Sequence, residues 1–114
     1  MTDLPEEFLR GVELFNNGEF FECHEVLEEI WMKANGDERE FLHALIQAAA
    51  ALHHIQRGNL KGAQSVGQRA IGKLAKLPPL MMRLDTTQFR ASLEQFLTET
   101  DAPIPHIALL GLNQ

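Results

Sequence analysis

The chain has 114 residues, of which 45% are hydrophobic and 23% charged, and its formal net charge is −6. This length fits one domain with one core, and the composition is that of ordinary globular proteins rather than disordered chains. No apolar stretch reaches the roughly 20 residues that a membrane-spanning helix needs, and the N-terminus lacks the features of a signal peptide. We therefore expect a cytoplasmic protein with one domain over residues 1–100 and an apolar tail over residues 101–114.

Helical periodicity predicts the first two helices, and there is hardly a strand signal anywhere in the chain. A capping-box pattern, Asp3 with Glu6, predicts the start of the first helix, and Gly18 predicts the turn that ends it. The second helix is expected to run from about Glu19 to about Lys33.

The third and fourth helices have contrasting patterns. The third is expected to begin at a second capping pattern, Asp37 with Glu40, and to end near Arg57. It is apolar on nearly every side, which predicts that it is the buried central helix. The fourth, from Leu60 to about Leu77, contains Gly62, Gly67 and Gly72. Each glycine costs about 1 kcal/mol relative to Ala, so we expect them to allow close approach to the alanine face of the third helix.

A proline pair and a third capping pattern predict the last part of the fold. Pro78 and Pro79 end the fourth helix, and Asp85 with Gln88 opens a fifth. Residues 103–110 are too apolar to remain in water. They either pack back on the bundle or form a docking strip for another chain, such as a second copy in a homodimer.

The two helix-turn-helix units resemble each other. Residues 18–23 and 58–63 occupy equivalent places forty residues apart, each a Gly turn followed by a helix with a small residue five positions on. This spacing is similar to that of tetratricopeptide repeats, which recur at about 34 residues and need about three copies to stand alone. The sequence thus predicts an all-α, five-helix bundle, built from two tetratricopeptide-like hairpins and a C-terminal helix.

Charge is divided between two segments of the chain. Residues 1–40 contain twelve acidic residues, whereas residues 41–84 contain none but have six cations. Such asymmetry is typical either of a nucleic-acid face or of an acidic hairpin that complements a basic one. The cations are scattered without interleaved aromatic residues, so the pattern does not favour nucleic acid. The single cysteine, Cys23, lies on an apolar helix side and is interpreted as an inert small hydrophobe.

Polar residues interrupt the apolar faces of the second and third helices. His24 and Glu28 are an i, i+4 pair between Phe21 and Trp31 on the second helix. The third helix has one polar sector: Glu40, His43, Gln47 and His54. If the two sectors face each other, His24, Glu28, Gln47 and His54 form a polar cluster inside the bundle. Buried polar groups are costly unless they are partnered.

Three interpretations of this cluster remain open. It is a hydrogen-bond network that fixes helix register, or a pocket for a small ligand or peptide with Trp31 and Phe21 as walls, or a metal or catalytic site. The sequence disfavours the metal site. A di-iron bundle needs two Glu-x-x-His motifs, and only Glu40 with His43 fits. His24 also lacks the second histidine of the zinc-protease motif.

Two motifs carry a family resemblance. The first runs from Phe15 to Trp31 and contains Phe20-Phe21-Glu22-Cys23-His24-Glu25; the second runs from Phe41 to Asn59 and contains Leu45-Ile46-Gln47. Over roughly residues 8–77 the chain resembles the bacterial and plastid family called domain of unknown function 309. The resemblance implies a helical bundle with no assigned activity. It implies that the family's signature positions fall on His24, Glu25, Glu28, Trp31, Gln47 and Arg57.

These residues, together with His54, make up the predicted polar pocket between the second and third helices. We interpret the chain as a non-enzymatic binding or adaptor module for a protein or a small molecule, with no cofactor and no metal. The alternative is a metal-dependent or general acid/base enzyme that uses His24 and Glu28.

Overall fold

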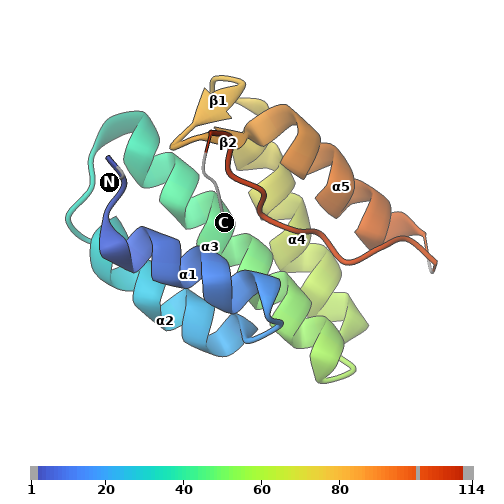
Figure 1. The fold of residues 1–114 in the computed structure, drawn as a ribbon. Coiled ribbons are helices and arrows are strands. Elements are labelled where there is room, and N and C mark those ends of the chain that lie inside the picture. The colour runs from blue at the N-terminus through green and yellow to red at the C-terminus, as the bar shows by residue number, and fades with distance from the viewer. Residues whose placement is uncertain (1–2, 100, 112–114) are drawn as a thin grey trace.

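Five helices form the protein in a computed structural model, which describes residues 3–99 and 101–111 (Figure 1). The helices are α1 Glu6–Asn16, α2 Phe20–Trp31, α3 Gly36–Gln56, α4 Leu60–Ala75 and α5 Thr86–Thr98. Two short strands, β1 Leu80–Met81 and β2 Leu84–Asp85, pair antiparallel between α4 and α5. The predicted all-α, five-helix bundle is confirmed. Residues 1–2, 100 and 112–114, which include the end of the predicted tail, lie outside the described part.

Helix α3 is the centre of the bundle, as predicted. It packs against α2 on one side and α4 on the other, while α1 packs on α2 and α5 on α4 (Figure 1). Its inward side is built from apolar residues, and its alanines Ala44, Ala48, Ala49 and Ala51 are fully buried. One stripe of α3 stays partly open to solvent, and it contains Arg39, His43, Gln47, Ala50 and His54. In the described ranges no helix is both long and apolar enough to span a membrane.

Of the three predicted caps, one is confirmed and two are wrong. The Asp85 side chain accepts a hydrogen bond from the backbone N–H of Gln88 at 2.9 Å, which caps α5. Helix α1 has no side-chain cap, because Pro5 occupies its N-cap position; the carboxylate of Asp3, two residues earlier, pairs with Arg83. Helix α3 begins at Gly36, so Asp37 lies inside its first turn and caps nothing.

The turns of the two hairpins have the same geometry. Gly18 and Gly58 both have positive φ angles, 79° and 76°. In each turn the next N–H donates to the carbonyl five residues earlier: Glu19 to Leu14 at 2.9 Å and Asn59 to His54 at 2.8 Å. Gln56 donates a hydrogen bond to the Gly18 carbonyl at 2.8 Å, which holds the two turns together at one end of the bundle. The shared turn alone does not test the predicted tetratricopeptide-like pairing of the helices, which stays a prediction.

The three glycines of α4 have different surroundings. A Cβ at Gly67 would collide with Leu97 and lie 3.6 Å from the Ala51 Cβ, so the predicted close approach is confirmed here and includes α5. A Cβ at Gly62 would lie 2.6 Å from the Asn59 amide that caps α4. The prediction is wrong for Gly72, whose Cβ would meet nothing within 4 Å.

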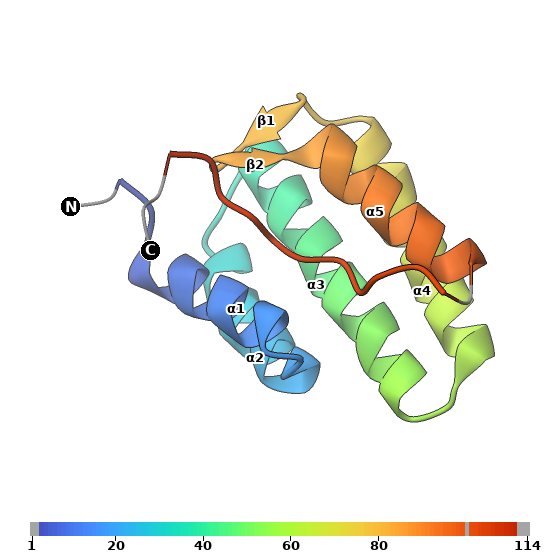
Figure 2. The ribbon, with the colours of Figure 1, turned by 45° about the vertical axis from the view of Figure 1, so that its right-hand side comes forward.

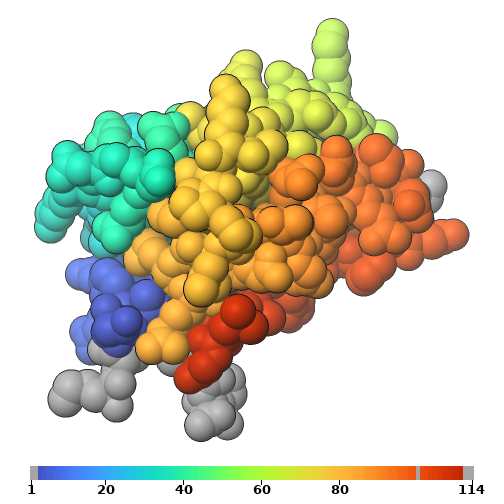
Figure 3. Space-filling view, turned by 90° about the horizontal axis from the view of Figure 1, so that it is seen from above, coloured from blue at the N-terminus to red at the C-terminus, as the bar shows by residue number. Residues whose placement is uncertain are grey.

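The β1–β2 hairpin was not predicted. Met82 and Arg83 form its turn with positive φ angles of 45° and 67°, which are uncommon for residues other than glycine. In a view from above, the hairpin residues lie between the start of α3 and α5 (Figure 3). The Arg83 carbonyl accepts a hydrogen bond from Leu110, so the hairpin also holds the tail.

The tail packs back on the bundle, which is one of its two predicted arrangements. It runs between α1 and α5 (Figure 2). The side chain of Asn16 bonds both backbone groups of Ile107, donating to its oxygen at 2.9 Å and accepting from its nitrogen at 2.8 Å. Pro105 and Ile107 are buried.

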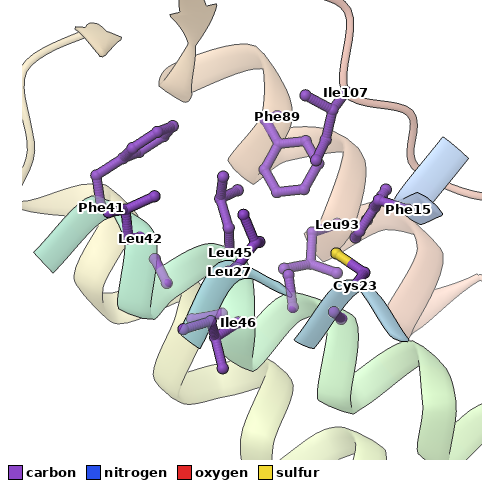
Figure 4. Packing of buried hydrophobic residues seen from close by; sticks show 14 of the residues in the cluster. Phe15, Cys23, Leu27, Phe41, Leu42, Leu45, Ile46, Phe89, Leu93 and Ile107 are labelled. Carbon is purple, nitrogen blue, oxygen red and sulfur yellow. The ribbon is translucent and has the colours of Figure 1, made fainter. Parts of the chain in front are cut away.

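Ile107 and Cys23 belong to the same core cluster as Phe15 and Phe89, which Figure 4 shows from close by. The Cys23 side chain is 0% exposed, and burial raises the pKa of its thiol to about 12. The interpretation of Cys23 as a small buried hydrophobe is confirmed. Burial is the cause of the raised pKa.

Candidate functional site

The structure does not link the predicted cluster by polar contacts. His24 and Glu28 are half-buried on α2, and Glu25 is exposed. Within residues 3–99 and 101–111, no hydrogen bond or ion pair joins His24 or Glu28 to each other or to Gln47. Nor does any group of three or more His, Cys, Asp or Glu side chains in these ranges have an arrangement suited to a metal ion.

His54 has a local partner instead. Its Nδ1 lies 3.2 Å from the side-chain nitrogen of Asn59, whose oxygen accepts the Gly62 N–H at 2.9 Å. His54 therefore joins the end of α3 to the first turn of α4. Arg57 lies exposed in the turn between these helices.

Trp31 is part of an aromatic and cationic stack at the α2–α3 contact. The Arg39 guanidinium lies 4.3 Å from the Trp31 ring centroid and donates a hydrogen bond to the Trp31 carbonyl at 3.0 Å. The His43 ring stacks on Trp31 with a centroid distance of 5.2 Å and an interplanar angle of 25°. Such contacts hold His43, which belongs to the open stripe of α3, against Trp31 of α2.

A groove lies between α3 and α4, with a volume of about 490 Å³. One side of the groove is formed by α3, with Asp37, Glu40, His43 and Gln47. The other side is formed by Arg69, Gly72 and Lys73 of α4 and by Lys76 and Leu77, which directly follow α4. Spacings of three and four residues put the residues that each helix contributes on one of its faces. We call this site the α3–α4 groove. Its volume is in the range of small-molecule sites. Of the predicted pocket residues, Gln47 lines it.

Gln47 is unusual among the side chains of the described residues. Its Oε1 is the one buried side-chain oxygen or nitrogen in those ranges that has no hydrogen-bond partner. A buried acceptor without a partner costs about 1–3 kcal/mol. Gln47 thus lines the groove with its carbonyl oxygen buried and without a hydrogen-bond partner among the described residues.

The electrostatics of the groove centre on one ion pair. Lys73 Nζ lies 2.8 Å from a Glu40 carboxylate oxygen, and this hydrogen bond lowers the pKa of Glu40. The pKa of His43 is also lowered, chiefly by burial and then by the charge of Lys73. Arg69 and Lys76 form no ion pair in the described part of the chain.

The same ion pair bears on the charge asymmetry. The Glu40–Lys73 and Asp3–Arg83 pairs both join the acidic first forty residues to the basic segment that follows. They support the interpretation that acidic and basic parts of the chain complement each other.

The sequence analysis interpreted the basic residues of the fourth helix as scattered, and for this reason it did not predict the groove. Arg69, Lys73 and Lys76 follow the spacing i, i+4, i+7, which places them on one helix face. That spacing, together with a glycine at position 72 on the same face, was the available signal.

Two relatives of the chain are described only as uncharacterized proteins. An uncharacterized protein of Aquifex aeolicus is 33% identical over 84 residues, covering 73% of this chain and 25% of that protein. The uncharacterized protein YpuF of Bacillus subtilis is 38% identical over 61 residues, covering 53% of this chain and 35% of that protein. The matches thus span only about a quarter to a third of the length of these relatives.

The fold is shared with a solved structure. The crystal structure of a conserved hypothetical protein from Thermus thermophilus matches with a TM-score of 0.71 and 33% identity, over 82% of this chain and 97% of that chain. Residues 8–66, about half of the chain, match the family described as domain of unknown function (DUF309). The chain therefore belongs to the domain of unknown function 309 family.

Proposed function

We propose that the chain is a non-enzymatic, cytoplasmic binding module whose ligand site is the α3–α4 groove. The observation that carries this proposal is the buried, unpartnered Oε1 of Gln47 in the groove wall. An apolar side chain of similar length at this position would avoid the cost of that oxygen. A ligand that accepts a hydrogen bond from the NH₂ of the same amide would offset this cost.

Gly72 supports the same conclusion. It lies in the middle of α4, where glycine costs about 1 kcal/mol relative to Ala. No neighbour requires its small size, because an added Cβ would meet nothing within 4 Å. A larger side chain at this position would extend into the α3–α4 groove, so Gly72 keeps the groove open for a ligand.

The groove also has a built-in reporter. His43 lines the groove and stacks on Trp31, which is the single tryptophan of the sequence. A ligand that contacts His43 changes the surroundings of the indole ring. Binding is therefore expected to alter the intrinsic fluorescence.

The test is a fragment screen by two-dimensional NMR on the labelled full chain. We expect bound fragments to shift resonances of the lining residues. We expect Gly72→Leu to reduce the affinity for these fragments at least tenfold. Gln68→Leu is the matched control, since Gln68 is exposed on the same helix outside the groove. The proposal is overturned if no fragment shifts the resonances of the lining residues, or if the Gly72→Leu and Gln68→Leu variants bind the fragments with equal affinity.

A second measurement addresses the alternative enzyme. Added divalent metal is expected to leave the melting temperature unchanged in the wild type. A rise that His24→Ala removes would support a metal-dependent enzyme using His24 and Glu28, and would contradict the binding module.

A further inference from the structure

We infer that the α3–α4 groove binds a small oxyanion, the phosphate or carboxylate group of an organic ligand, between Gln47 and Arg69. This inference rests on the proposed function and names the chemistry of the ligand. It is carried by the donors that line one end of the groove and by the way the α3–α4 ion pair divides the groove.

The Glu40–Lys73 ion pair fixes how the two sides of the groove face each other. Helices α3 and α4 are joined by a tight turn and run antiparallel (Figure 1). Residues after Glu40 on α3 therefore face residues before Lys73 on α4. Gln47 and Arg69 lie on one side of the ion pair, whereas Asp37 and Lys76 lie on the other.

The Gln47 end of the groove is rich in donors. Arg69 has no ion pair in the described ranges, so its guanidinium is available for a bidentate contact with an oxyanion. Lys73 adds a second cation at the border of this end, although Glu40 already neutralises part of its charge. Both carboxylates of the groove, Asp37 and Glu40, lie at or beyond the ion pair and away from this end.

The orientation of Gln47 fits an acceptor ligand. Of its two amide atoms, only Oε1 is buried without a partner. Since Gln47 lines the groove while its Oε1 is buried, we assign its NH₂ as the group that faces the ligand. A ligand oxygen that accepts from this NH₂ offsets the cost of turning the carbonyl oxygen inward. A ligand without acceptors gains nothing from this arrangement.

The probes for the test are inorganic phosphate and acetate, each titrated into the full chain at constant ionic strength set with sodium chloride. Trp31 fluorescence and the NMR shifts of the Gln47 side-chain NH₂ report binding. We expect at least one of the two anions to saturate, and the stronger one indicates whether the natural group is a phosphate or a carboxylate. Constant ionic strength is needed because exposed charges are screened by salt.

Variants separate the site from general attraction of anions. Arg69→Gln and Gln47→Met are each expected to reduce the affinity for the more tightly bound anion at least fivefold. Lys61→Gln is the control, because Lys61 is an exposed cation of α4 outside the groove and the variant removes the same charge as Arg69→Gln. The inference is overturned if neither anion saturates, or if Lys61→Gln weakens binding as much as Arg69→Gln.

The outcome is distinguishable from failure of the proposed function. If fragments bind the groove but phosphate and acetate do not, the binding module stands and the oxyanion is wrong. If neither fragments nor anions bind, both are wrong.

Discussion

Two glycines of α4 provide a matched pair for testing how the helix packs. Gly67 and Gly72 lie in the interior of the same helix, so substitution by Ala gains about the same helix propensity at each, about 1 kcal/mol. Their surroundings differ. An added Cβ at Gly72 meets nothing within 4 Å, whereas one at Gly67 collides with a terminal methyl of the buried Leu97.

The expected free energies of unfolding follow from this difference. Gly72→Ala is expected to stabilise the protein by about 1 kcal/mol, which raises the melting temperature by roughly 4 °C in a domain of this size. Gly67→Ala must also displace Leu97, and overpacking of this kind costs about 1–3 kcal/mol. The two variants should therefore differ by about 1–3 kcal/mol, with Gly67→Ala the less stable.

Urea denaturation followed by circular dichroism measures both values. The m-values of the two variants should match that of the wild type, so that midpoints can be compared directly. The reasoning is refuted if Gly67→Ala is as stabilising as Gly72→Ala, because the close approach of α4 to α5 would then impose no constraint. It is also refuted if Gly72→Ala destabilises the protein.

Three other predictions concern single side chains. Burial lowers the pKa of His43 below the unfolded value of 6.5, so the folded state favours the neutral imidazole. The contribution of His43 to the free energy of unfolding should be full above pH 6.5 and decrease as the pH falls through the folded pKa, which NMR titration and pH-dependent denaturation measure. His43→Gln should make the free energy of unfolding less dependent on pH in this range. The thiol of Cys23, with a pKa of about 12, should react with a disulfide reagent only as fast as the protein unfolds. Asn16→Ala removes two hydrogen bonds to Ile107, so it should lower the free energy of unfolding by about 1–3 kcal/mol and make the tail sensitive to limited proteolysis. Asn17→Ala, at an exposed position, is the control and should have neither effect.

Those parts of the fold that depend on local sequence could be predicted. The glycine turns at Gly18 and Gly58 and the Asp85 cap involve residues within five positions of each other, and all three are confirmed. The cap expected from Asp3 failed because α1 begins later, with Pro5 at its N-cap, while the Asp3 carboxylate pairs with Arg83, eighty residues away. The β1–β2 hairpin was missed because the tertiary structure, rather than a glycine, holds its left-handed turn.

The candidate site was only partly predictable for a similar reason. Periodicity put His43, Gln47 and His54 in one sector of the third helix, and the structure places all three in its half-open stripe. Periodicity does not tell which neighbour lies beside each residue of that stripe. His43 meets Trp31 of α2, Gln47 lies in the groove beside α4, and His54 bonds the α4 cap.

The repeated turn geometry raises the question of whether the oxyanion site is also repeated. The two hairpins are related by a shift of forty residues, and this shift relates Gln47 and Arg69 to Glu7 and Glu29. The first hairpin thus has two acids where the second has an amide and a guanidinium, and two carboxylates repel an anion. We therefore expect one oxyanion per chain. A phosphate or acetate titration followed by NMR should shift resonances of α3 and α4 at a stoichiometry of one. A second saturable set of shifts on α1 and α2 would show that shared backbone geometry, rather than the charges of α4, selects the anion.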